Sequence, residues 1–134
     1  AESLVGTREL TVTVLRDKPL CVTEIKTGKN NDFYNYEAKY ARGGSFHEIP
    51  AQIPKVISKQ AMSWALRAHQ IIGCKGISRS DFRYDPNNSQ LFMLEINTQP
   101  GMTKTSLAPE QGAFCNINMV KMVRILIEEA TYEC

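Results

Sequence analysis

Several features that define large classes of protein are missing from this sequence. Its 134 residues contain no apolar run near the roughly 20 residues needed to span a bilayer, so we expect no membrane partner. The formal net charge is only +2, which is too small to favour nucleic acid as a partner. The first residues lack the basic segment and apolar stretch of a signal peptide. We therefore expect a globular, cytoplasmic protein, since 43% hydrophobic and 22% charged residues are ordinary values for that class.

Clustered metal ligands are also missing. The two histidines, His47 and His69, have no second ligand at a suitable spacing, so we expect neither to bind a metal. None of the four cysteines forms a CxxC or CxxH pair, which argues against both a zinc site and a disulfide framework. We expect all four to be reduced thiols: Cys21, Cys74, Cys115 and Cys134.

Two segments have the periodicity of helices. Pro54 suits a first helical turn and Gly73 is placed to end the same helix. We expect its apolar face to be buried, with the only tryptophan in the core: Ile57, Ala61, Trp64, Ala65, Ala68 and Ile72. The second helix is predicted from an N-cap at Asn118 to about Ala130. Because apolar residues surround it, we expect it to pack on two sides or against another domain; its principal face would hold Val120, Val123, Ile127 and Ala130.

Two hairpins are predicted, one before and one after the first helix in the sequence. Alternating apolar residues at 10–14, the turn at 16–19 and the apolar segment 20–25 form the first. The second surrounds the turn residues 85–89, DPNNS. Its apolar faces would meet if Tyr84 were paired with Phe92, and Phe82 with Leu94.

The same register places acidic residues opposite one another on the second hairpin. It sets Asp81 opposite Glu95, and Arg79 opposite Asn97. Like charges directly opposite destabilise a sheet, so a positive group should lie between them. Two carboxylates and an amide oxygen suit Mg²⁺ or Mn²⁺ and the phosphates those ions carry. A polar outer face with an Arg–Asp pair is the alternative, and on pattern alone it is the favoured interpretation.

Aromatic residues are concentrated at 33–40, FYNYEAKY, after the polar segment 27–32. Such a segment forms either a buried cluster or a lid that closes over a ligand, and the pair Gly43-Gly44 favours the lid. The expected order is strand, strand, lid, helix, strand, strand, helix. That order predicts an α+β domain in which helices cover an antiparallel sheet.

Three segments in this order, FYNYEAKY, GCKGISRSDF and LEINTQPGMTKTSL, resemble segments of the D-alanine–D-alanine ligases, a family of the ATP-grasp superfamily. The resemblance runs from Glu2 to about Ala130. It implies that residues 1–134 are the carboxy-terminal subdomain of an ATP-grasp fold, with amino-terminal and central domains absent. A tryptophan that is frequent in the family is missing near Ile77, which affects packing more than chemistry.

The resemblance also implies a reaction. ATP would phosphorylate the carboxylate of one D-alanine to an acyl phosphate, which the amine of a second D-alanine would attack to form the dipeptide for peptidoglycan. Two Mg²⁺ or Mn²⁺ ions would assist, and the intact enzyme would be a homodimer. By this resemblance the 134-residue chain alone would have little or no ligase activity.

Site residues follow from the same resemblance. Asp81 and Glu95 would hold one metal ion, and Glu95 and Asn97 the other. Arg79 and the backbone amide of Gly101 would stabilise the oxyanion of the tetrahedral intermediate.

Substrate-binding residues are implied as well. Lys39 would contact the transferred phosphate, Tyr40 would help to close the site over the first alanine, and Ser106 and Leu107 would bind the carboxylate of the second. Glu9 would hold the ribose hydroxyls, although without the resemblance it is an exposed strand residue. The nucleotide contacts would be Glu2, Leu4, Val5, Glu9, Leu94 and Lys39.

Two other interpretations stay open. The chain could belong to another ATP-grasp ligase that joins a different carboxylate to an amine or thiol, including one that accepts D-lactate or D-serine. It could instead be a non-catalytic module that binds a partner through its apolar last helix. The joint presence of Asp81, Glu95 and Asn97 argues against that second interpretation, because a non-catalytic copy does not need them together.

Overall fold

The computed structural model describes residues 5–27 and 45–130 of the chain. Within them, five strands form one antiparallel sheet in the order β3-β2-β1-β4-β5. The strands are β1 (Arg8–Leu15), β2 (Lys18–Thr27), β3 (Ser45–Glu48), β4 (Ile77–Asp85) and β5 (Gln90–Asn97). The helices are α1 (Lys55–Ile72), α2 (Leu107–Phe114) and α3 (Met119–Glu129).

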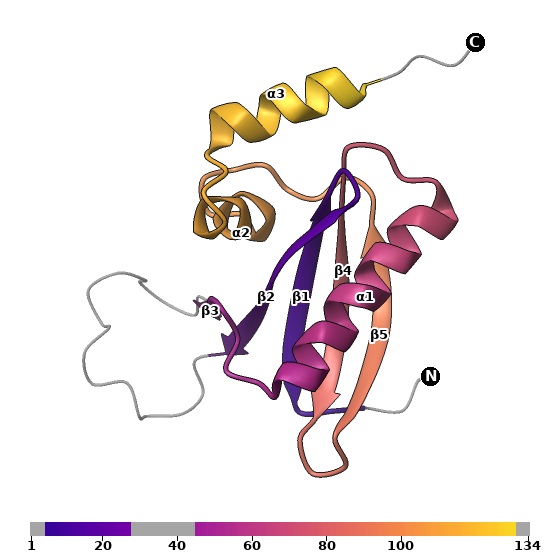
Figure 1. The fold of residues 1–134 in the computed structure, drawn as a ribbon. Helices are drawn as coiled ribbons and strands as arrows, with labels where there is room; N and C mark the ends of the chain where they lie inside the picture. Colours follow the sequence, from indigo (N-terminus) through magenta and orange to yellow (C-terminus); the bar gives the residue numbers. More distant parts are fainter. Residues whose placement is uncertain (1–4, 28–44, 131–134) are drawn as a thin grey trace, which may run out of the picture.

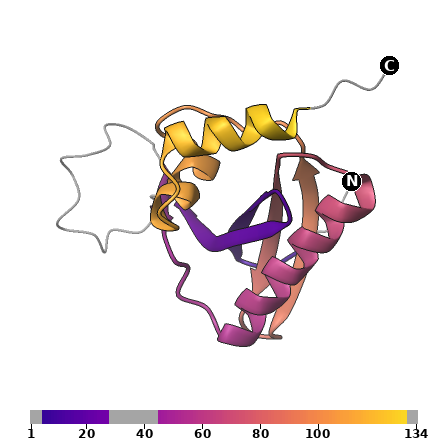
Figure 2. The same ribbon diagram turned by 45° about the horizontal axis from the view of Figure 1, so that its top comes forward.

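Helices cover both sides of this sheet (Figures 1 and 2). Helix α1 crosses one face, whereas α2 and α3 lie near the end at which β1 turns into β2 (Figure 1). The predicted α+β architecture is therefore confirmed, but β3 and α2 were not predicted. None of the helices in the described part of the chain is both long and apolar enough to cross a membrane.

The main core lies between α1 and the sheet. Strands β1 and β4 supply Leu10, Val12, Phe82 and Tyr84, all nearly inaccessible to solvent. Helix α1 meets them with the stripe Ile57, Ala61, Ala65 and His69 at i, i+4 spacing. The small alanines allow the helix to approach the sheet closely.

The expectations that Trp64 and Ile72 are buried on this helix were wrong. Trp64 is 37% exposed because it lies one position away from the buried stripe of α1, and Ile72, the last residue of the helix, is 55% exposed. His69 is buried instead, and its Nδ1 lies 2.7 Å from the hydroxyl of Ser78. Burial lowers the pKa of His69 and so favours the neutral imidazole in that hydrogen bond.

A second, smaller core joins α2 and α3 to the sheet. It contains Leu15 and Ile77 from the strands, Ala108 from α2 and Met122 from α3. The predicted N-cap of α3 is confirmed, since the side chain of Asn118 accepts a hydrogen bond from the amide of Lys121. Met122 of α3 is buried in this core, whereas these residues on the other side of the helix are exposed in the described part of the chain: Val120, Val123 and Ile127.

The register of the β4–β5 hairpin differs from the prediction in the half next to the turn. Phe82 pairs with Met93 and Tyr84 with Leu91, whereas the next pair is Asp81 with Glu95. Leu94 is therefore an extra residue, a β-bulge, between two registers. The predicted pairs Tyr84–Phe92 and Phe82–Leu94 were wrong because an uninterrupted alternation was assumed.

The described cysteines are free thiols. Cys21 is buried, while Cys74 and Cys115 are partly buried. Burial, with the neighbouring Cys115 as a smaller cause, raises the pKa of the Cys21 thiol to about 12. Cys21 is therefore protonated at neutral pH and a poor nucleophile.

Gly6 allows the chain to enter β1 close to the end of β4. Its φ angle is +63°, and a Cβ atom there would lie 2.9 Å from the carbonyl carbon of Tyr84. Gly6→Ala is expected to lower the free energy of unfolding by about 2 kcal/mol or more, because left-handed strain adds to a clash with backbone. Urea unfolding would measure the change.

Gly73→Ala is the matched control for Gly6→Ala. Gly73 also has a positive φ, +71°, but a Cβ atom there would meet nothing within 4 Å. It should therefore show the left-handed strain without the clash, about 1 kcal/mol. Equal losses for both variants would contradict the close approach at Tyr84.

Candidate functional site

The sheet face opposite α1 carries polar side chains on three neighbouring strands. Thr11 on β1 pairs with Asp81 on β4, and Asp81 pairs with Glu95 on β5. Arg79 pairs with Asn97 in the same ladder. Both predicted pairings of polar residues are confirmed. The structure thus brings the two carboxylates, the guanidinium and the carboxamide together beside the β-bulge.

Asp81 is held from two directions. Arg79 donates from Nε to Oδ1 at 2.9 Å and from Nη2 to Oδ2 at 2.8 Å. The hydroxyl of Thr11 donates to Oδ1 at 2.7 Å. The side chains of Arg79 and Asp81 are 20% and 18% exposed, so the pair is shielded from water but still reachable.

Arg79 keeps donors available after it has bound Asp81. A guanidinium has five N–H groups, and the ion pair occupies two of them. Its hydrogen bond with Asp81, followed by the charges of Asp81 and Glu95, raises the pKa of Arg79, so the side chain remains charged. The remaining edge of the guanidinium can bind a second anionic oxygen.

Glu95 and Asn97 stand at the end of β5. Glu95 is exposed, and Asn97 is partly buried. The side-chain oxygen of Asn97 accepts a hydrogen bond from the amide of Gln99 at 2.9 Å, which orients the carboxamide in the turn that follows the strand. Both residues therefore present oxygen atoms at the end where β5 leaves the sheet toward α2.

This donor set fits a magnesium ion. In the described residues there is no group of three or more His, Cys, Asp or Glu side chains that could enclose a metal. Asp81, Glu95 and Asn97 instead offer two carboxylates and one amide oxygen. Mg²⁺ is typically held by one or two carboxylates, with substrate phosphates and water completing its shell. An all-oxygen set on this polar sheet face suits that arrangement.

A short loop joins this site to α2. The hydroxyl of Ser106 accepts a hydrogen bond from the amide of Thr103 at 3.0 Å and lies 2.7 Å from the hydroxyl of Thr103. A Cβ atom at Gly101 would lie 2.9 Å from the same Ser106 oxygen. Leu107 is the first residue of α2. The predicted residues Gly101, Ser106 and Leu107 are thus close neighbours in one compact turn.

Helix α2 is fixed to the sheet by buried hydrogen bonds. Gln111 is fully buried; its oxygen accepts from the amide of Thr13 at 2.8 Å, and its nitrogen donates to the carbonyl of Thr11 at 3.1 Å and to the hydroxyl of Thr23 at 2.9 Å. His47 Nδ1 also lies 2.6 Å from a carboxylate oxygen of Glu110. These contacts fix the position of the turn at Gly101–Leu107 relative to β1.

The other predicted site residues are less tightly grouped. Glu9 lies on the polar face with a carboxylate oxygen 3.6 Å from Nη2 of Arg83. Val5 is partly buried, and Leu94 is 52% exposed at the bulge. The remaining predicted residues lie outside the described part of the chain: Glu2, Leu4, Lys39 and Tyr40.

Sequence reasoning did not identify Thr11 and Gln111 as part of this region. Thr11 reads as an ordinary polar position in an alternating strand, and its bond to Asp81 spans 70 residues of sequence. Gln111 lies in a short segment without helical periodicity. No local signal could have identified either residue.

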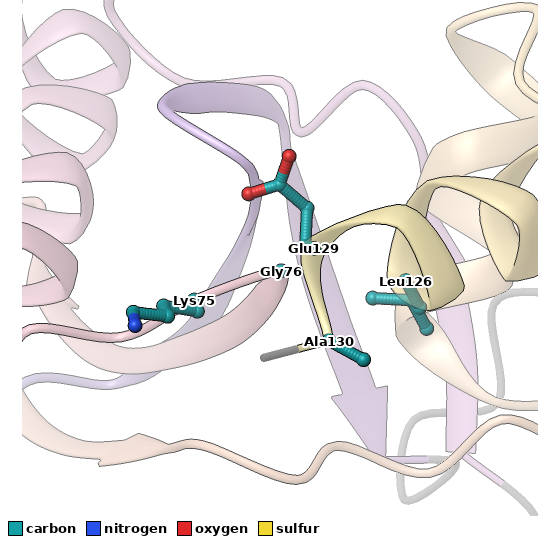
Figure 3. Close-up of a pocket in the computed structure, with 5 residues that line it drawn as sticks. All are labelled: Lys75, Gly76, Leu126, Glu129 and Ala130. Carbon is teal, nitrogen blue, oxygen red and sulfur yellow. The ribbon is translucent and has the colours of Figure 1, made fainter. Parts of the chain in front are cut away.

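A hollow of about 290 Å³ lies elsewhere, between the end of α3 and the start of β4. Figure 3 shows its lining, with the carboxylate of Glu129 above Gly76 and the amine of Lys75 to its left. A Cβ atom at Gly76 would lie 3.2 Å from the side chain of Leu126. This hollow is therefore the seam at which α3 packs on the strand.

Sequence comparison gives the same relationship over nearly the whole chain. Residues 1–128 match the family described as D-ala D-ala ligase C-terminus. The D-alanine–D-alanine ligase of Gluconobacter oxydans is 49% identical over 129 residues, which cover 96% of this chain and 43% of the relative. That of Zymomonas mobilis is 50% identical and covers 99% of this chain and 41% of the relative. The chain thus spans less than half the length of these curated relatives.

Solved structures share the fold. The D-alanine–D-alanine ligase from Bacillus anthracis complexed with ATP superimposes with a TM-score of 0.78 at 24% identity, covering 96% of this chain and 41% of that one. The VanG D-Ala:D-Ser ligase from Enterococcus faecalis superimposes with a TM-score of 0.74 at 28% identity, covering 95% and 37%. These similarities confirm the predicted carboxy-terminal half of an ATP-grasp fold.

Proposed function

The chain belongs to the D-ala D-ala ligase C-terminus family, and on that premise we propose that it supplies catalytic residues for an ATP-dependent D-alanine–D-alanine ligase. The carboxylate of one D-alanine attacks the γ-phosphate of ATP to give an acyl phosphate and ADP. The amine of a second D-alanine then attacks the acyl carbon, and phosphate leaves. The dipeptide would serve peptidoglycan synthesis.

The chemical obstacle is the repulsion between a carboxylate and a triphosphate. Asp81, Glu95 and Asn97 would hold Mg²⁺ or Mn²⁺, which supplies positive charge to the phosphate oxygens. The chain's own cation is Arg79, whose free edge would bind the oxyanion of the tetrahedral intermediate while its other edge holds Asp81. The amide of Gly101 would donate to the same oxyanion.

The remaining roles complete the proposal. Ser106 and Leu107 would bind the carboxylate of the second D-alanine at the start of α2, where backbone amides favour an anion. Glu9 would accept from the ribose hydroxyls, and Val5 and Leu94 would line the nucleotide. By the family resemblance, Lys39 would contact the transferred phosphate and Tyr40 would help to close the site over the first D-alanine. Glu2 and Leu4 would contact the nucleotide.

The single observation that carries this proposal is the pairing of Asp81 with Glu95 and of Arg79 with Asn97 on the open face. The test is phosphate release from ATP and Mg²⁺, with and without D-alanine, comparing this chain with a full-length protein that contains it. We expect release only from the longer protein and only with D-alanine. If neither protein responds to D-alanine, the substrate assignment fails and other acids must be tested.

The identity of the second substrate, the amino acid whose amine attacks the acyl phosphate, needs a separate measurement. The similarity to a D-Ala:D-Ser ligase at 28% identity favours D-serine as the competing acceptor. Supplying D-alanine and D-serine together and identifying the dipeptide by mass spectrometry would decide between them. We expect mainly D-alanyl-D-alanine, because the curated relatives at about half identity are D-alanine–D-alanine ligases.

Gly101→Ala is expected to reduce kcat about tenfold to a hundredfold in the full-length protein, because small displacements of reacting groups are costly. The new methyl group would push the Ser106 hydroxyl away and break its hydrogen bond with Thr103. Steady-state kinetics would measure the loss. Thr105→Ala is the control in the same turn, since among the described residues the Thr105 hydroxyl makes only a weak 3.4 Å contact with that of Thr103. An equal loss in the control would contradict the specific clash.

A further inference from the structure

We propose that Thr11 is a positioning residue for Asp81: its hydroxyl fixes one carboxylate oxygen, so that the other is presented to the metal ion. The inference rests on the proposed function, because it concerns how the chain prepares one ligand of that ion. Thr11 belongs to a different strand from every predicted metal ligand. It would act through Asp81 without touching the substrate.

The first support is the geometry of the hydroxyl. Thr11 Oγ1 lies 2.7 Å from Asp81 Oδ1 and 3.3 Å from the carbonyl oxygen of Ser80. A hydroxyl has one proton to donate, and it goes to the nearer, charged carboxylate oxygen of Asp81, which is the stronger acceptor. Thr11 is completely buried, so its hydroxyl is shielded from solvent.

The second support is a count of acceptor positions on Asp81. Each carboxylate oxygen has about two acceptor positions. Oδ1 receives both Thr11 Oγ1 and Arg79 Nε, whereas Oδ2 receives only Arg79 Nη2. Among the described residues, the acceptor position without a donor is therefore on Oδ2. Without the hydroxyl of Thr11, the two oxygens would be nearly equivalent, because each would accept one hydrogen bond from Arg79.

The third support is the rigidity of Thr11 itself. It lies in β1, between β2 and β4, and its carbonyl accepts a hydrogen bond from the buried Gln111 at 3.1 Å. A β-branched side chain has few rotamers in a strand. The hydroxyl therefore has a fixed position from which to orient Asp81, as partners of metal ligands do in other sites.

The test compares three variants in a full-length protein that contains these residues. Thr11→Val keeps the shape and removes the hydroxyl, and Thr11→Ser keeps the hydroxyl. Thr13→Val is the matched control, because Thr13 is equally buried on the same strand but its hydroxyl has no hydrogen-bond partner among the described residues. Mn²⁺ binding, followed by electron paramagnetic resonance with a non-hydrolysable ATP analogue, gives a readout independent of turnover.

We expect Thr11→Val to weaken Mn²⁺ binding about tenfold to a hundredfold, the usual effect of losing a partner of a metal ligand. Thr11→Ser should bind nearly as well as the wild type, and Thr13→Val should be unchanged. The Mg²⁺ concentration for half-maximal rate should rise for Thr11→Val, while kcat at saturating Mg²⁺ stays within about threefold. A structural defect alone would not be rescued by excess metal.

Each outcome decides something different. Unchanged Mn²⁺ affinity in Thr11→Val, with binding lost in Asp81→Asn, would overturn this inference and leave the proposed function intact. Absence of Mn²⁺ binding in the wild type with nucleotide would instead overturn the metal site of the proposed function. If Thr11→Val does not fold, Thr11→Ala and Thr11→Ser replace it, and equal affinities in that pair overturn the inference.

Discussion

Glu95→Gln is expected to reduce kcat of the full-length protein by about a thousandfold while leaving its fold intact. Glutamine has the same shape but removes the negative charge opposite Asp81. Losing one carboxylate ligand of a metal that stabilises transferred phosphate costs several kcal/mol, and about 4 kcal/mol corresponds to a factor of a thousand. Phosphate release with ATP, Mg²⁺ and D-alanine would measure it.

The stability of this variant should move little, or in the opposite direction to its activity. Glu95 is exposed, and like charges directly opposite on a sheet are destabilising. Thermal unfolding without metal should therefore give an equal or slightly higher Tm. Glu128→Gln is the control, since Glu128 is an exposed carboxylate paired with Arg16 far along the chain. Near-normal turnover of Glu95→Gln would remove Glu95 from the metal site.

The pairing of Asp81 with Glu95 could be predicted from sequence because a hairpin restricts its own register. The predicted apolar pairs are offset by one residue, and the bulge at Leu94 restores the predicted register at Asp81 and Glu95. The predicted pairs in the half next to the turn were wrong because Leu94 is apolar like its neighbours. Nothing in the local pattern distinguishes a leucine that occupies a bulge from one that continues the alternation.

Helix α2 was missed for a different reason. Its sequence, LAPEQGAF, contains a proline and a glycine and has no apolar stripe. A Cβ atom at Gly112 would displace the terminal methyl group of Met122, so the glycine leaves room for the buried side chain of α3. The helix is stabilised by tertiary contacts, chiefly those of Gln111, and these are absent from any local window of sequence.

The cross-strand environment of Asp81 likewise could not be predicted from the sequence. Its metal-ligand chemistry follows from the residue type, but the hydroxyl that orients it comes from β1, 70 residues earlier. The order β1-β4-β5 places these strands side by side, and that order was not predicted. Residue types thus indicated the chemistry of the site, whereas the sheet topology was needed to identify its supporting residues.

Arg79→Lys is expected to lower kcat about a hundredfold to a thousandfold, even though the positive charge is retained. A lysine ammonium is a point charge and cannot hold both oxygens of Asp81 with one edge while donating to an oxyanion with another. The guanidinium in the structure already uses Nε and Nη2 on Asp81. Removal of one oxyanion donor alone costs about a hundredfold to a thousandfold in other enzymes.

Arg79 has two proposed contacts, one with Asp81 and one with the oxyanion, and this variant can test them separately. Loss of the two-point hold on Asp81 should also weaken Mn²⁺ binding, whereas loss of the oxyanion contact should leave it unchanged. Measuring kcat and Mn²⁺ affinity together therefore separates the two edges of the guanidinium. Arg16→Lys is the control, because Arg16 forms ion pairs with Glu128 and Glu129 among side chains that are 35% to 52% exposed. Normal turnover in Arg79→Lys would show that charge alone is sufficient and that neither edge has the proposed role.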